Sequence, residues 1–140
     1  MTANPSELLP HGPRAVLVET ILAHDDTSLH CVARIPSTSS FGVDGSAPTY
    51  LAIEICAQAA ALHQAITGGS QRRAKGLLAQ VSSMSLDARP LRAESPCEVT
   101  VRRRSQAFGF ASWTVSLSQD GRVAAEGNLT TFIDSDVDAR

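Results

Sequence analysis

The chain has 140 residues, of which 43% are hydrophobic and 19% are charged. That length can build one domain with a sizeable buried core, and the composition excludes disorder over most of the chain. The formal net charge of −2 provides no overall positive field, so sequence-independent binding to nucleic acid is not expected. We therefore predict a single globular domain over residues 1–140.

Cysteine usage and the apolar segments narrow the class further. Cys31, Cys56 and Cys97 are odd in number and widely spaced, which fits neither a disulfide framework nor a zinc site. They predict reduced core residues in a cytoplasmic protein without a metal. The first residues lack the basic and apolar regions of a signal peptide. The longest apolar stretch, 50–66, is interrupted by polar side chains, so we expect no membrane span.

The first half of the chain predicts a hairpin and then a long helix. Residues 15–22 and 28–35 are rich in apolar and β-branched residues, with a polar turn between them. The Pro/Ser/Gly-rich stretch 36–47 predicts a loop long enough to suggest a functional role. From Pro48 to the two glycines after Thr67 the residues favour a helix of about 20 residues. This segment is apolar nearly all round, so we expect it to be buried on most sides.

The second half predicts about four antiparallel strands. They are expected at 75–86, 97–104, 110–118 and 123–133, with a bend at Phe108 and Gly109 and a tight turn at 119–121. Apolar and polar residues alternate on the second and third of these strands, and the first carries the apolar residues Leu78, Val81 and Met84. A single buried helix followed by such a meander predicts an α+β architecture, in which one curled antiparallel sheet wraps around the helix.

Two segments of the chain resemble a known family. Leu8-Leu9-Pro10-His11 is followed eight residues later by Glu19. Residues 40–58 keep, without a gap, the spacing of the pattern H-F-x-G-(H/D)-P-x-M-P-G, four residues, E/D-A-x-A-Q, although Ser40 stands in place of its first histidine and Thr49 in place of its last glycine. Both segments resemble the bacterial 3-hydroxyacyl-(acyl carrier protein) dehydratases, and they are similar to the divergent dehydratase-like proteins of aryl-polyene biosynthesis. The resemblance implies a hotdog fold and dehydration of an acyl thioester, as in fatty-acid or polyene synthesis, without a cofactor.

The same alignment indicates the catalytic residues. Glu54 occupies the position of the family's helix carboxylate, whereas Ser40 occupies that of its histidine. A serine hydroxyl ionises too weakly near neutral pH to replace an imidazole. Asp44 is either a turn residue or a second carboxylate of the site, and His11 is either a structural contact or the substitute for the missing histidine. Glu54 itself is either an acid/base group or a structural anchor bonded to Gln58, one helical turn away.

Other residues are candidates for binding. The loop and the start of the helix are expected to line the substrate site through Phe41, Gly45, Pro48, Thr49, Tyr50 and Gln58. Two basic clusters would suit a phosphopantetheine arm or an acidic carrier protein if they converge; otherwise they are solvated strand ends. The clusters consist of Arg72, Arg73 and Lys75, and of Arg102, Arg103 and Arg104. No aromatic residue is interleaved with either, so nucleic acid is not expected.

Three functions follow from these features. The first is a 3-hydroxyacyl thioester dehydratase acting on carrier-protein or CoA substrates. The second is a thioesterase, in which one carboxylate acts on the thioester without a histidine. The third is an incomplete subunit that pairs with a second hotdog protein. Because an unpaired edge strand favours continuation of the sheet across a two-fold axis, a homodimer is expected, or a heterodimer in the third case.

Overall fold

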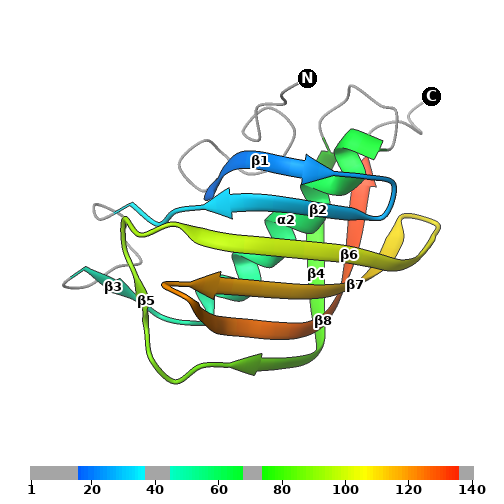
Figure 1. Cartoon of the computed structure of the whole chain (residues 1–140). Coiled ribbons are helices and arrows are strands. Elements are labelled where there is room, and N and C mark those ends of the chain that lie inside the picture. The colour runs from blue at the N-terminus through cyan, green and yellow to red at the C-terminus, as the bar shows by residue number, and fades with distance from the viewer. Residues whose placement is uncertain (1–15, 37–44, 68–73, 136–140) are drawn as a thin grey trace.

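The computed structural model describes residues 16–36, 45–67 and 74–135, and it shows one antiparallel sheet with a single helix against one face (Figure 1). The sheet has six strands in the order β1-β2-β6-β7-β8-β4, and β3 and β5 form a second, two-stranded sheet. The elements are β1 (Val18–His24), β2 (Ser28–Ala33), β3 (Ser46–Ala47), α2 (Leu51–Thr67), β4 (Ala74–Leu86), β5 (Leu91–Arg92), β6 (Cys97–Ala107), β7 (Phe110–Gln119) and β8 (Arg122–Ser135). The predicted α+β hotdog architecture is confirmed.

The β1–β2 hairpin forms where the sequence predicts it. Asp25 holds the turn, because its Oδ1 accepts hydrogen bonds from the backbone N–H groups of Thr27 at 2.9 Å and Ser28 at 2.8 Å. These bonds, led by the one from Thr27, lower the pKa of the Asp25 carboxyl. Leu29 and Cys31 on β2 are fully buried, which confirms the predicted alternation of this strand.

The β6–β7–β8 meander follows the same period-two rule. Val99 on β6 and Trp113 on β7 are fully buried, whereas their immediate neighbours along each strand are more exposed. Asp120 and Gly121 join β7 to β8 with φ angles of 55° and 75°. Positive φ at both central residues is typical of the type I′ hairpin turn, whose twist matches that of the flanking strands.

Helix α2 crosses the concave face and supplies the centre of the core. Eleven of its 17 residues are buried, as expected for a segment that is apolar nearly all round. It begins at Leu51 rather than at Pro48. Residues 48–50 form an initial turn, in which their carbonyl oxygens accept hydrogen bonds from the N–H groups three positions ahead. Within the described ranges, no helix is long and apolar enough to cross a membrane.

Polar side chains connect the last turns of α2 to the sheet. His63 is fully buried, and its Nε2 lies 2.9 Å from the carbonyl oxygen of Asp25 in the β1–β2 turn. Its ring meets the ring of Trp113 edge-on, with centroids 5.4 Å apart. Trp113 Nε1 donates to Thr131 Oγ1 at 2.9 Å, and Thr131 Oγ1 donates to Gln64 Oε1 at 3.1 Å. His63 therefore links the helix to the β1–β2 turn and to β7.

One local expectation was wrong. The stretch 36–47 was expected to be a loop, yet its last two residues, Ser46–Ala47, pair with Leu91–Arg92 as β3 and β5. Val81 on β4 is 40% exposed. The β4–β8 register shifts between Val81 and Ser83, and such an irregularity changes the face that a side chain occupies. The side chain of Leu78 is outside the described part.

Candidate active site

Glu54 lies in the first turn of α2 and is half-buried. A carboxylate at this end of a helix is stabilised by the backbone N–H groups and the helix dipole. Its neighbour Ile55 is fully buried in the core, so the helix holds Glu54 at the margin of the apolar interior. The carboxylate is therefore neither fully solvated nor sealed away.

Gln58 fixes the orientation of Glu54. The side chain of Gln58 is fully buried, and its Nε2 donates a hydrogen bond to Glu54 Oε2 at 3.2 Å. Its Oε1 accepts a bond of 2.8 Å from the backbone N–H of Leu17, just before β1. One amide thus links the helix carboxylate to the sheet. Gln58, expected among the substrate-binding residues, has the geometry of a positioning residue.

The other expected binding residues gather around the start of the helix. Gly45 has a φ of 76° and precedes β3, and its carbonyl accepts a bond of 2.9 Å from Ala93 N. Thr49 is half-buried, and its Oγ1 donates to the carbonyl of Arg89 at 2.9 Å. Tyr50 is 62% exposed. The structure therefore brings Gly45, Pro48, Thr49 and Tyr50 to the end of the helix that carries Glu54. His11, Ser40, Phe41 and Asp44 lie outside the described residues.

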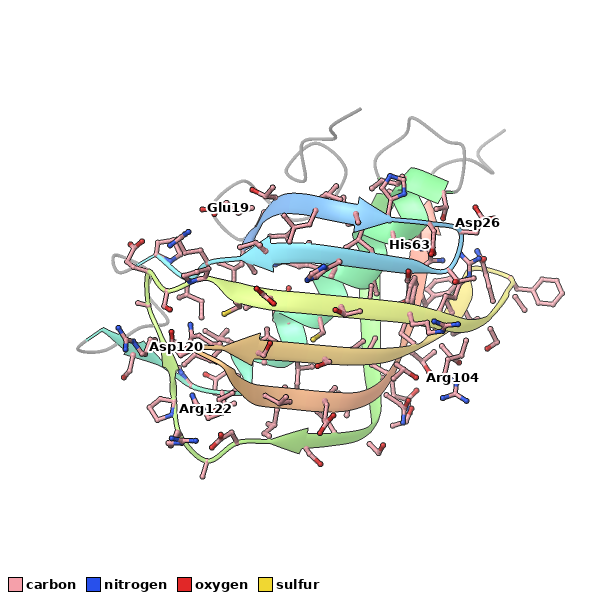
Figure 2. All side chains as sticks on the ribbon, viewed as in Figure 1. Glu19, Asp26, His63, Arg104, Asp120 and Arg122 are labelled. Carbon is pink, nitrogen blue, oxygen red and sulfur yellow. The ribbon has the colours of Figure 1, made fainter. Side chains whose placement is uncertain are left out.

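The basic run Arg102–Arg104 lies at the other end of the molecule, where β6 turns into β7 (Figure 2). Arg103 binds the β1–β2 turn, because its Nη2 donates to the carbonyl of Asp26 at 2.9 Å. Arg104 Nη1 donates to Thr114 Oγ1 at 3.2 Å on the outer face, and Arg102 is exposed. The three side chains thus do not converge on one point. Arg72, Arg73 and the side chain of Lys75 lie outside the described part.

The cysteines are buried and unoxidised. All three are free thiols in the core, and burial raises the pKa of Cys31 and Cys56 to about 12 and that of Cys97 to about 11. Thiols that remain protonated are poor nucleophiles and metal ligands. Over residues 16–36, 45–67 and 74–135, no group of three His, Cys, Asp or Glu side chains is placed to hold a metal ion.

Sequence reasoning missed two features of this region. The bond between Gln58 and Leu17 spans 41 positions, and a groove near the start of the helix is lined by Arg89, Arg92 and Arg122. The first had a partial signal, since the spacing of Glu54 and Gln58 indicated that they could bond. The second had none, because no two of these arginines are adjacent in the sequence.

A curved antiparallel sheet around one central helix, with a carboxylate in its first turn, defines a hotdog-fold protein. The ApeP-like family, described as ApeP dehydratase, matches residues 3–140. The chain belongs to this family. No functionally curated protein is significantly similar to it in sequence.

Solved structures share the fold over most of the chain. The dehydratase heterocomplex ApeI:P from Xenorhabdus doucetiae contains a chain with a TM-score of 0.78 and 21% identity, and the match covers 98% of this chain and 95% of that one. A mutant thioesterase from Pseudomonas aeruginosa matches with a TM-score of 0.56 and 15% identity, over 82% and 80% of the two chains. A hypothetical thioesterase with coenzyme A from Streptococcus pneumoniae has a TM-score of 0.57 and 16% identity, over 82% and 84%.

Proposed function

We propose that this chain is one subunit of a 3-hydroxyacyl thioester dehydratase, and that Glu54 supplies one of the two proton-transfer groups. The observation that carries the proposal is the placement of Glu54. It is half-buried at the start of α2 and is bonded through Gln58 to the sheet. A carboxylate held at a fixed angle and partly removed from water is suited to general acid–base catalysis.

The reaction needs two protons to move. A base removes a proton from C2 of the acyl chain, an acid protonates the C3 hydroxyl, and the C3–O bond breaks as the C2–C3 double bond forms and water leaves. Backbone N–H groups at the start of the helix would stabilise the charge that develops on the thioester oxygen. Glu54 can serve as the acid or the base, but a second group is needed on the other side of the substrate.

We propose that the second group comes from a different hotdog subunit. Position 40, which carries histidine in the resembled dehydratases, is serine here. The fold neighbour with a TM-score of 0.78 comes from a dehydratase heterocomplex. In the described sheet β4 is an edge strand of 13 residues, with β8 as its one neighbour. Such an edge can pair with the equivalent strand of another hotdog subunit and bring a loop histidine to Glu54.

Within this chain, His11 and Asp44 are the other candidates for the second group. His11 would replace the missing imidazole, and Asp44 would position the substrate or transfer a proton as a second carboxylate. If His11 has this role, the purified chain is active without a partner and the His11→Asn variant is not. If the partner supplies the group, His11→Asn leaves the activity of the complex unchanged.

Turnover of a 3-hydroxyacyl carrier-protein substrate tests the proposal. The chain alone is expected to be inactive, whereas the chain mixed with a second dehydratase subunit that carries the loop histidine is expected to form the enoyl product. In that complex, Glu54→Gln should reduce the rate about 10²- to 10⁴-fold. Full activity of the Glu54→Gln complex would refute the assigned role. A thiol reagent added to the same assay detects thioester hydrolysis, and free thiol without enoyl product would identify a thioesterase instead.

The carrier surface is a separate part of the proposal. Arg102 and Arg104 are exposed on the β6–β7 end and can contact an acidic carrier protein, whereas Arg103 is bonded to the β1–β2 turn. Neutral substitutions of Arg102 and Arg104 should raise the KM for a carrier-linked substrate. They should not change the KM for a small thioester that lacks the carrier.

A further inference from the structure

A groove of about 410 Å³ lies where the β4–β5 connection meets the β7–β8 turn. We call it the arginine groove. Figure 2 shows Asp120 and Arg122 at this end of the molecule, opposite Arg104. Its size is in the range of small-molecule sites, which runs from about 300 to 1,000 Å³. The lining residues are Arg89, Pro90, Arg92, Asp120 and Arg122.

The groove concentrates positive charge in a protein with an overall charge of −2. Its lining has three guanidinium groups and one carboxylate. Arginine is suited to phosphate esters, because its planar donors match two phosphate oxygens at once. The walls also offer the carbon atoms of Pro90 and of the arginine stems, which can contact the organic part of a ligand.

Two carboxylates pair with the three guanidinium groups, closely with Arg122 and loosely with Arg89 and Arg92. Asp87 Oδ2 lies 2.9 Å from Arg122 Nη1 and 3.5 Å from Arg89 Nη2, and Asp120 Oδ2 lies 3.7 Å from Arg92 Nε. The side chains of Arg89 and Arg92 are 72% and 71% exposed, so they can turn toward an anion in the groove. The Arg122 side chain is only 20% exposed and forms the fixed part of the wall.

The backbone of the groove is continuous with the start of the helix. The carbonyl of Arg89 accepts the hydrogen bond from Thr49 Oγ1, and Arg92 pairs with Ser46 in the β3–β5 ladder. The buried side chain of Gln119 fixes the backbone of Arg92. Its Oε1 accepts a hydrogen bond from Arg92 N, and its Nε2 donates one to Arg92 O, both at 2.8 Å. A ligand anchored in the groove would therefore be held at the same end of the molecule as Glu54.

We propose that the arginine groove binds the phosphate of a phosphopantetheine arm whose thioester end enters the site of Glu54. The identity of the arm rests on the proposed function, because acyl thioesters of carrier proteins and of CoA share this group. Anchoring the phosphate would reduce the freedom of the flexible arm and raise the effective concentration of its thioester at the helix. The phosphate of a carrier-linked arm is esterified to the carrier itself, so a carrier held through the groove would lie at this end of the molecule. The surface of Arg102 and Arg104 is then the alternative docking site, which the KM measurements above test.

Calorimetric titration of the full chain, in its complex if it is unstable alone, with 4′-phosphopantetheine and with pantetheine tests the proposal. We expect the phosphate to increase affinity about tenfold or more, as for a charge-assisted hydrogen-bonded pair. The double variant Arg89→Gln/Arg92→Gln should lose this advantage, and Arg92→Lys should keep part of it. Arg102→Gln removes an exposed arginine at the other end and should preserve the phosphate preference. Far-ultraviolet circular dichroism checks that each variant is folded.

Further ligands distinguish the sources of the phosphate. Equal affinity for 4′-phosphopantetheine and CoA indicates recognition of the phosphate shared with a carrier-linked arm, and tighter binding of CoA, lost in the double variant, indicates that the nucleotide phosphates also bind. Equal binding of phosphopantetheine and pantetheine would overturn the proposal, as would a phosphate preference that survives in the double variant. Glu54→Gln should reduce dehydration about 10²- to 10⁴-fold without changing phosphate binding. A complex that binds the arm through Arg89 and Arg92 but does not dehydrate refutes the proposed function alone.

Discussion

Replacing Gln58 with Met tests the link between the fold and the candidate site. Met has a similar length but offers no amide, so the bonds to Leu17 N and Glu54 Oε2 are both lost. Leu17 is only 4% exposed, and leaving its N–H without an acceptor costs about 1–3 kcal/mol. The bond to Glu54 is partly replaced by water because Glu54 is half-buried. We therefore expect a loss of about 3 kcal/mol in the free energy of unfolding.

Urea denaturation and thermal melting measure this loss. With an unfolding entropy of about 2.1 cal/mol/K per residue, a chain of 140 residues should melt about 10 °C lower. In the active complex, kcat should fall more than KM rises, because the variant releases Glu54 without removing a substrate contact. The exposed Gln106 near the end of β6 provides the control, and Gln106→Met should change stability by less than about 0.5 kcal/mol. A Gln58→Met protein as stable and active as the wild type would refute the positioning role.

Three further predictions concern the fold. A Cβ at Gly127 would lie 2.1 Å from the carbonyl oxygen of Ser83, so Gly127→Ala should destabilise the β4–β8 pairing by about 1–3 kcal/mol in urea denaturation. Because burial raises the pKa of Cys31 and Cys56 to about 12, a thiol reagent should label them only after denaturant is added. Burial lowers the pKa of His63, so the unfolded chain binds its proton more readily. Stability should therefore fall as the pH drops below about 6.5, less steeply in His63→Gln; an equal slope would contradict this assignment.

Local periodicity made most of the fold predictable. The alternation on β2, β6 and β7 is visible in the sequence because successive side chains of a strand face opposite sides. The segment from Pro48 to Thr67 favours a helix and is apolar nearly all round, so the sequence predicted a helix that the sheet buries on most sides. The β3–β5 ladder was not predicted, because a strand of two residues is too short to show an alternation of apolar and polar side chains. The register shift between Val81 and Ser83 was not predictable, because it depends on the pairing of β4 with β8.

The candidate site was predictable only where its parts lie close in the sequence. Glu54 and Gln58 are one turn apart, so their bond could be expected from the helix alone. The bond from Leu17 to Gln58 depends on how β1 approaches the helix. Arg89, Arg92 and Arg122 form one wall because the β7–β8 turn lies beside the β4–β5 connection. Consecutive residues such as Arg102–Arg104 are conspicuous in a sequence, whereas charges gathered by the fold are not.

The serine at position 40 has a consequence for the stoichiometry of the proposed enzyme. A homodimer of this chain would contain two Glu54 carboxylates and no loop histidine, so both of its sites would lack the same group. In the proposed heterodimer, whose partner carries both groups, one site would combine Glu54 with the partner's histidine. The other would combine the partner's carboxylate with a chain that has serine at position 40. Only the first site then holds a complete acid–base pair. The proposed complex therefore has one competent site per heterodimer, and Glu54→Gln removes it, whereas losing the partner's own carboxylate leaves it intact.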